Sequence, residues 1–219
     1  MTVPSDAEIV GLMAKLYAPQ PGDFDHIEDP SSDDFGDDGV CWAAKQYGGL
    51  AVLVFRGSMT KEDWFRDAIS ELPAPGSRVP QCAEFGVLPL GFGMGMYAAM
   101  TRWTAYTRSR VIIAGHSLGA ARAVIAAALD LAYGGTVDKI VLCGCPRPGT
   151  NILTDYLADI DIRSYRNLGD PVCDVPTEPP WAHVRPFTAL SEPPPAGDIS
   201  IFRDHHIELY EAGVAKLGA

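Results

Sequence analysis

The sequence predicts an α/β protein in which helices cover both faces of a mainly parallel sheet. After residue 50, apolar runs of strand length alternate with segments of helical pattern, which is typical of parallel strands joined by crossover helices. The run 50–55 is apolar at every position, so it predicts a strand buried on both faces. A chain of 219 residues can bury one sizeable core of this kind. We therefore expect residues 1–219 to form a single domain.

The N-terminal third predicts one helix and one antiparallel hairpin. Ser5 and Glu8 have the spacing of a capping box, and apolar residues on one helical face follow as far as Leu16. Residues 40–47 and 50–56 predict two strands joined by Gly48 and Gly49, a typical hairpin turn. Residues 22–39 carry eight acidic side chains without Lys or Arg, so we expect a solvated loop there.

The remaining segments predict the alternating part of the fold. Further strands are expected at 111–114, 139–144 and 161–167. Helices are expected at 91–107, with a loose glycine-rich start, and at 120–131 and 204–217. Residues 171–195 are rich in proline and predict a loop, with a possible strand around His183.

Composition excludes several classes of partner. The net charge of −11 opposes binding to nucleic acid, whose phosphates require clusters of Lys and Arg. It also opposes tight docking on anionic lipid, so we expect at most a transient contact with a lipid interface. No apolar run reaches the length of a membrane span. Asp6 and Glu8 interrupt the start, which does not resemble a signal peptide, so we expect a cytoplasmic protein, or a secreted one if a leader was removed.

Residues 110–122 predict a nucleophilic serine. A short apolar run leads directly into Gly115-His116-Ser117-Leu118-Gly119, and an alanine-rich helix follows. This strand, G-x-S-x-G, helix arrangement is a nucleophile elbow, in which a strained turn holds the serine hydroxyl clear of the backbone. Ser117 would then lie at a helix N-terminus, where free N–H groups favour developing negative charge.

Five segments of the sequence resemble motifs of the class 3 (fungal-type) lipases, and they occur in the same order as in that family. They are Phe55-Arg56-Gly57-Ser58 followed by Asp63-Trp64, the elbow at 115–119, Gly144-Cys145-Pro146-Arg147-Pro148-Gly149, Asn167-Leu168-Gly169-Asp170-Pro171-Val172, and Asp204-His205-His206 with Tyr210 downstream. The chain departs from the family at Pro89-Leu90-Gly91-Phe92, where His-x-Gly-Phe is frequent. The resemblance implies an α/β-hydrolase fold with a mostly parallel central sheet, an N-terminal antiparallel hairpin and helices on both faces.

The same motifs suggest the acid and the base that a nucleophilic serine needs. Asp170 follows a predicted strand and precedes a proline, and both its motif and the chain order Ser, Asp, His favour it; Asp174 is a competitor. The Asp-His alignment with the family favours His205 as the base, with the adjacent His206 as the alternative. We therefore predict Ser117, Asp170 and His205 as catalytic residues.

The oxyanion hole and the substrate contacts are predicted less directly. The N–H of Leu118, next to the nucleophile, is the expected first donor. The resemblance implies that Ser58 supplies the second. Trp64, Phe92 and His116 are candidate substrate-binding residues, although Phe92 could equally belong to the core, and His116 could pack behind the turn.

The sequence thus predicts a serine carboxylic ester hydrolase that acts on acylglycerols or related fatty-acyl esters through an acyl-enzyme. Such chemistry needs no metal and no cofactor, and we expect an ester or lipid small molecule as the substrate. A small-ester esterase, a phospholipase A1-like enzyme and an acyltransferase fit the same motifs. A non-catalytic binding domain would lack a triad member, and all three are present.

Overall fold

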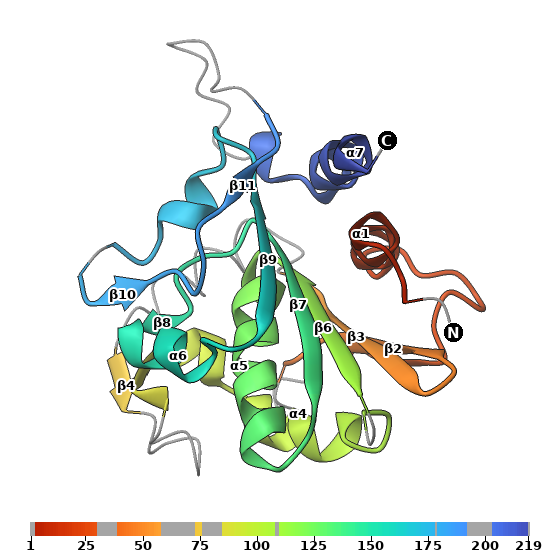
Figure 1. Cartoon of the computed structure of the whole chain (residues 1–219), viewed down its shortest axis with the longest axis horizontal. Coiled ribbons are helices and arrows are strands. Elements are labelled where there is room, and N and C mark those ends of the chain that lie inside the picture. Colours follow the sequence, from red (N-terminus) through yellow and green to blue (C-terminus); the bar gives the residue numbers. More distant parts are fainter. Residues whose placement is uncertain are drawn as a thin grey trace.

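The computed structural model describes residues 3–29, 39–57, 73–75, 85–107, 110–177, 179–191 and 203–218. Among them a seven-stranded sheet forms the centre of the molecule (Figure 1). Its strands, in spatial order, are β1 (His26–Glu28), β2 (Trp42–Tyr47), β3 (Leu50–Phe55), β6 (Val111–His116), β7 (Val137–Cys143), β9 (Asp161–Arg166) and β11 (Thr188–Ala189). β1, β2 and β3 pair antiparallel, whereas β3, β6, β7, β9 and β11 are parallel. The predicted fold class and hairpin are confirmed.

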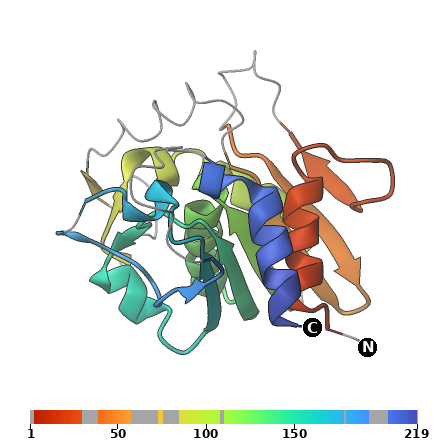
Figure 2. The same cartoon turned by 90° about the horizontal axis from the view of Figure 1, so that it is seen from above.

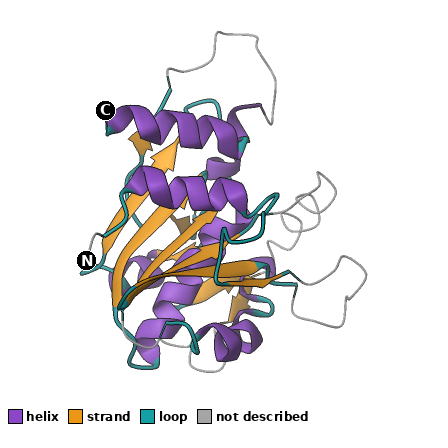
Figure 3. Cartoon of the chain, turned by 90° about the vertical axis from the view of Figure 1, so that its right-hand side faces the viewer, coloured by secondary structure: helices purple, strands orange, loops and turns teal. Residues whose placement is uncertain are grey.

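Helices cover both faces of this sheet. α1 (Asp6–Lys15) and α7 (Ile207–Leu217) lie side by side on one face (Figures 2 and 3). α4 (Met96–Trp103) and α5 (Leu118–Ala132) cover the other, where the larger core cluster lies. The central strands β3 and β6 are buried at every position because they contribute side chains to both layers.

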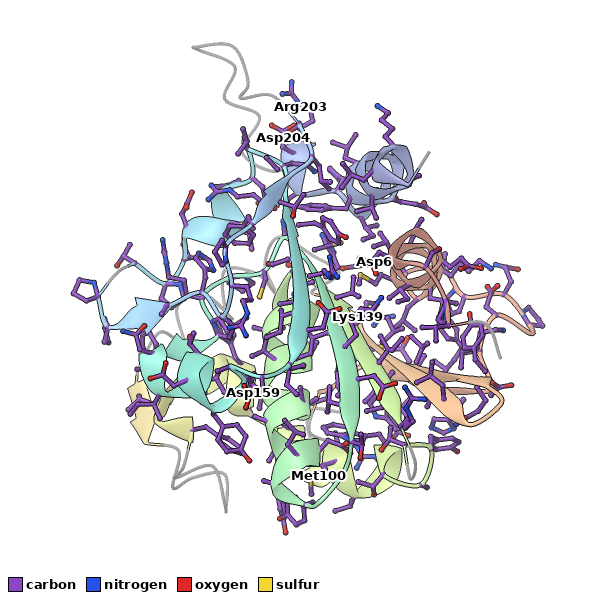
Figure 4. All side chains as sticks on the ribbon, in the orientation of Figure 1. Asp6, Met100, Lys139, Asp159, Arg203 and Asp204 are labelled. Carbon is purple, nitrogen blue, oxygen red and sulfur yellow. The ribbon has the colours of Figure 1, made fainter. Side chains whose placement is uncertain are left out.

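α1 is fixed to the sheet at its first turn. The predicted capping box is present, since Ser5 and Glu8 bond reciprocally. Asp6 accepts a hydrogen bond from the ammonium of Lys139 on β7, at 2.8 Å; both residues are labelled in Figure 4. It also accepts from the hydroxyl of Tyr165 on β9, at 2.5 Å. The N-terminal helix is therefore held across two neighbouring parallel strands.

Three expectations from the sequence are wrong. Within 171–195, expected to be a loop with a possible strand around His183, β11 joins the edge of the main sheet through its pairing with β9. The acidic segment does not form only a loop, because β1 pairs with β2 at the edge of the sheet. This strand is only three residues long and is held by its neighbours, since the His26 ring packs against those of Trp42 and Tyr106, which also contact each other. The helix expected at 91–107 is split into α3 (Leu90–Gly93) and α4, because Gly95 has a φ of 76°, which interrupts helical geometry.

Short elements complete the described structure. β4 (Pro73–Pro75) pairs with β5 (Val87–Pro89), and β8 (Gly149–Thr150) pairs with β10 (Trp181–Ala182) next to the possible strand expected at His183. α6 (Asn151–Tyr156) packs beside β8. Two 3₁₀ turns, η3 (Pro171–Asp174) and η4 (Arg203–His205), follow β9 and precede α7. None of the described helices is long and apolar enough to cross a membrane.

Candidate active site

Ser117 occupies a strained turn between β6 and α5. Its φ of 62° makes it the one non-glycine residue with positive φ in the described part of the chain. Such a backbone conformation is costly for a residue with a side chain and persists where the surroundings enforce it, often at functional sites. The turn connects a buried parallel strand to a buried helix, so the arrangement expected of a nucleophile elbow is present.

Two glycines allow the strand and the helix of the elbow to approach closely. A Cβ at Gly115 would lie 2.1 Å from the carbonyl oxygen of Gly119. A Cβ at Gly119 would lie 2.2 Å from the carbonyl oxygen of Phe55 at the end of β3. Both distances are far below van der Waals contact, so any side chain would force β6, α5 and β3 apart. The G-x-S-x-G spacing is therefore a packing requirement as well as a sequence motif.

His205 lies between Ser117 and Asp170. Its Nε2 is 2.7 Å from the Ser117 Oγ, and its Nδ1 is 2.7 Å from the Asp170 Oδ2. The carboxylate accepts from Nδ1–H, which leaves Nε2 free to accept the serine proton. His206 is exposed at the N-cap of α7. Of the two adjacent histidines, His205 is thus the one that meets the serine.

The Asp170 carboxylate is fully buried and well supplied with donors. Its Oδ2 also accepts from the Tyr210 hydroxyl, and its Oδ1 accepts from the Val172 N–H at 2.9 Å, which caps η3. Burial alone would raise the pKa of this carboxyl, but the hydrogen bonds from His205 and Tyr210 hold the pKa below its ordinary value of 3.8. The group is therefore an anion that orients the imidazole.

Asp174, the competing acid, faces away from the histidine. Its carboxylate forms two hydrogen bonds with Arg166, at 2.9 and 2.6 Å, and its side chain is 55% exposed. The guanidinium of Arg147 donates to the carbonyl oxygens of Asp174 and Pro176. These two arginines fix the loop that carries Asp170.

Sequence reasoning assigned no role to two further residues around the acid and base. Gly144, after β7, has a φ of 58°, and a Cβ there would lie 2.9 Å from the Asp170 Oδ2 and 3.0 Å from the His205 Cε1. Asn167 donates through its side chain to the Asp204 carbonyl at 2.9 Å, which ties the acid loop to the segment of the base. Gly144 and Asn167 each begin one of the motifs that resemble the lipase family, and this position in a motif was the signal that could have identified them.

The other predicted site residues differ in how far the structure describes them. Leu118 opens α5, so its N–H belongs to the first turn, which has no intrahelical acceptor. Ser58 and Trp64 lie outside the described residues. Phe92 is 6% exposed within the larger core cluster, and His116 is buried behind the elbow, where it contacts Tyr17 and His205.

A cavity of about 640 Å³ lies apart from these residues, between α6 and the loop 179–187. Its lining includes Asn151, Trp181 and Phe187 but none of the residues around Ser117. In the described ranges, no cluster of three or more His, Cys, Asp or Glu side chains is arranged to hold a metal ion.

Comparison with known proteins finds similar chains among the lipases. A family model described as Lipase (class 3) matches residues 52–179. The triacylglyceride lipase of Rhizomucor miehei is similar, with a TM-score of 0.64 and 18% identity over 84% of this chain and 78% of that one. The mono- and diacylglycerol lipase of Aspergillus oryzae gives a TM-score of 0.61 and 16% identity over 88% and 82% of the two chains. At these identities the likeness establishes a shared α/β-hydrolase fold.

A third solved structure bears on the chemistry. It is a triacylglycerol lipase whose catalytic centre is formed by a serine protease triad, with a TM-score of 0.62 and 20% identity over 84% of this chain and 79% of that one. No curated protein matches the chain in sequence.

Proposed function

The chain belongs to the class 3 lipase family and is a lipase-type carboxylic ester hydrolase, and from this we propose that Ser117, His205 and Asp170 are its catalytic triad. The observation that carries the proposal is the position of His205, with one ring nitrogen 2.7 Å from a serine hydroxyl and the other 2.7 Å from a buried carboxylate. The triad of the similar triacylglycerol lipase supports it.

In the acylation step, the Ser117 Oγ forms a bond to the ester carbonyl carbon while its proton passes to the His205 Nε2. Asp170 stabilises the resulting imidazolium through Nδ1–H. The carbonyl oxygen becomes an oxyanion, which the Leu118 N–H and Ser58 stabilise. The tetrahedral intermediate collapses by breaking the bond to the alcohol oxygen, and His205 returns its proton to that leaving oxygen.

The second half of the reaction repeats this sequence with water. His205 removes a proton from water as the water oxygen attacks the acyl-enzyme carbonyl. Collapse breaks the bond to the Ser117 Oγ, which regains the proton from His205, and a carboxylic acid leaves. Apart from water, these steps use only groups of the chain and of its ester substrate.

We propose acylglycerols or related fatty-acyl esters as the substrate class. Two of the similar structures are lipases that act on glycerides, which supports this choice. A series of p-nitrophenyl esters of increasing acyl length tests it, with kcat/KM rising from acetate towards the longer chains. A maximum at acetate with loss of activity on longer chains would instead indicate a small-ester esterase.

The nucleophile is tested by replacing it. Ser117→Ala should lower ester turnover by at least about 10³-fold, because the acyl-enzyme cannot form. A fluorophosphonate should label the wild-type protein once, at Ser117, and should not label the variant. Ser5→Ala is the control, since it removes a hydroxyl that only caps α1 and should leave the turnover unchanged. Labelling at another serine would contradict the triad.

A further inference from the structure

His116 and Tyr17 form a buried hydrogen-bonded chain behind the nucleophile that the mechanism above does not use. From its geometry we infer that both are positioning residues, which hold the backbone of His205 and connect it to the turn after β3. This inference rests on the proposed triad. It assigns a function to the segment that follows α1, a part of the chain far from the motifs.

The hydrogen-bonded chain links three separate segments of the polypeptide. The His116 Nε2 is 2.8 Å from the carbonyl oxygen of His205, and its Nδ1 is 2.7 Å from the Tyr17 hydroxyl. That hydroxyl in turn accepts a hydrogen bond from the Gly57 N–H at 3.2 Å. The chain thus runs from the residue before Ser58, through the end of α1, to the backbone of the proposed base.

Elementary donor and acceptor rules give every bond in the chain a direction. The Gly57 N–H can only donate, so the Tyr17 oxygen accepts there and its own proton is available for the His116 Nδ1. The His205 carbonyl can only accept, so the His116 Nε2 must carry a proton. Neutral His116 protonated at Nε2 therefore satisfies all the partners at once. The His205 carbonyl selects this tautomer, and Tyr17 completes the chain by donating to Nδ1.

The surroundings hold His116 in that state. Its side chain is 4% exposed, and its ring stacks on that of His205 with centroids 4.7 Å apart and an interplanar angle of 28°. Burial and the facing His205 ring lower the pKa of His116 from 6.5 to about 3. Tyr210, Asp170 and His206 also act on this ring; Asp170 raises the pKa of His116 and His206 lowers it. The ring consequently supports His205 without carrying a competing positive charge.

The backbone on either side of the imidazole of His205 is fixed by these contacts. The Asp204 carbonyl accepts from Asn167, and the His205 carbonyl accepts from His116. Because the Nε2 of His205 must stay within hydrogen-bond distance of a serine held in a strained turn, a small backbone rotation would separate them. Loss of the His116 contact would free the second of the two carbonyls.

Gly57, at the other end of the hydrogen-bonded chain, also lies close to the nucleophile. A Cβ on Gly57 would lie 2.7 Å from the Ser117 Cβ and 2.8 Å from the Tyr17 hydroxyl. Gly57 is therefore packed against both Ser117 and Tyr17. A shift of Tyr17 would disturb both the base and the strand exit that leads to the predicted oxyanion residue Ser58.

The test removes the Tyr17 hydroxyl and keeps its ring. Tyr17→Phe should lower kcat about 10-fold with KM within about twofold, because the proposed base is misplaced while the substrate contacts remain. The rate constant for fluorophosphonate labelling of Ser117 should fall by a similar factor, and this readout does not depend on ester binding.

Tyr165→Phe is the matched control. It removes a hydroxyl that holds the other end of α1 to the sheet, through Asp6, and has no contact with the hydrogen-bonded chain. We expect it to lower the melting temperature without changing kcat or the labelling rate. A purely structural role for Tyr17 would give the two variants the same kinetics, and this result would overturn the inference.

Two substitutions of His116 provide an independent test. His116→Gln keeps an amide that can donate to the His205 carbonyl and accept from Tyr17, whereas His116→Phe keeps the volume and loses both bonds. The glutamine variant should retain more labelling activity than the phenylalanine variant at equal folded fraction. Equal rates for both would refute a hydrogen-bonding role. If wild-type Ser117 is not labelled at all, the proposed triad itself fails, and the two failures are thereby distinguished.

Discussion

At the scale of single residues, Asp170 and Asp174 lie four positions apart on one loop and have different roles. Asp170 is buried against His205, Tyr210 and the Val172 N–H, whereas Asp174 is half exposed in an ion pair with Arg166. An exposed ion pair contributes at most about 1 kcal/mol to stability. The buried carboxylate, by contrast, determines which nitrogen of the imidazole carries the proton.

Paired substitutions separate the two acids. Asp170→Asn should lower kcat by about 10³–10⁴-fold, because an amide can donate to the His205 Nδ1 and so favour the tautomer that cannot accept the serine proton. Asp174→Asn should keep kcat within about threefold and change the free energy of unfolding by less than about 1 kcal/mol. Steady-state kinetics and urea unfolding measure both. A larger loss of activity in Asp174→Asn would reassign the acid.

At the scale of elements, the backbone directly after β7 is as constrained as that of the turn at Ser117. Gly144 combines a φ of 58° with close approach to both Asp170 and His205, so its lack of a side chain leaves room for the acid–base pair. Gly134, after α5, has a φ of 79° but no atom within 4 Å of a Cβ position. The two glycines share a backbone conformation and differ in their neighbours.

This difference gives a controlled experiment on the β7 exit. Gly144→Ala and Gly134→Ala should each lose about 1–2 kcal/mol of stability, because alanine is strained at positive φ. In addition, Gly144→Ala should lower kcat by about 10²-fold, since its methyl group displaces the acid or the base. Urea unfolding and kcat, measured on both variants, separate strain from contact. Unchanged kcat in Gly144→Ala would show that the pair can move aside without loss.

The elements also show what the sequence could and could not predict. Uninterrupted apolar runs identified β3 and β6, because strands buried on both faces leave a strong pattern. β1 escaped prediction, since three residues are too few for a periodicity and the strand exists through its pairing with β2. The glycine-rich start of the helix at 91–107 was expected to be loose, but the full break before α4 depends on the φ of Gly95, which the sequence pattern does not give.

In the candidate site too, the sequence predicted residues that lie in local motifs and missed a residue whose contacts are long-range. Ser117, Asp170 and His205 were predicted because each lies in a short local motif, and the structure brings them within hydrogen-bond distance. The choice of His205 over His206 came from the resemblance, since adjacent identical residues carry no internal distinction. Tyr17 gave no signal, because its contact with His116 spans 99 positions and appears only when α1 packs on the sheet.

At the scale of the whole molecule, the two ends of the chain meet. α1 and α7 pack against one another on the same face of a sheet whose strands extend from residue 26 to residue 189. We propose that residues 1–219 form a single domain, because no described segment has a core of its own. Such a domain is expected to unfold in one cooperative transition, so its free energy of unfolding can be followed against pH.

Buried His116 and half-buried Asp6 should make that free energy fall with acid in separate pH ranges. The pKa of His116 is about 3 in the folded chain, because of burial and the facing His205, against 6.5 for an ordinary histidine. The unfolded chain therefore binds a proton that the folded chain does not, and stability declines as the pH falls from about 6.5 towards 3. Burial raises the pKa of Asp6, but hydrogen bonds from Lys139 and Tyr165 outweigh it, so the pKa is below 3.8. Its contribution is present above pH 3.8 and is lost as the pH falls through the lower folded value.

The His116 range can be isolated by urea unfolding of three proteins between pH 8 and pH 4, which lies above the range in which Asp6 titrates. Between pH 7 and pH 5, the wild type and Asp6→Asn should lose stability in parallel, because both retain His116. His116→Gln should lose less over the same interval, because its side chain binds no proton in either state. Parallel decline of all three would mean that folded His116 takes up a proton as readily as the unfolded chain. The Tyr17 hydroxyl would then have to accept from Nδ1–H, and the fixed direction of hydrogen bonding behind the nucleophile would be lost.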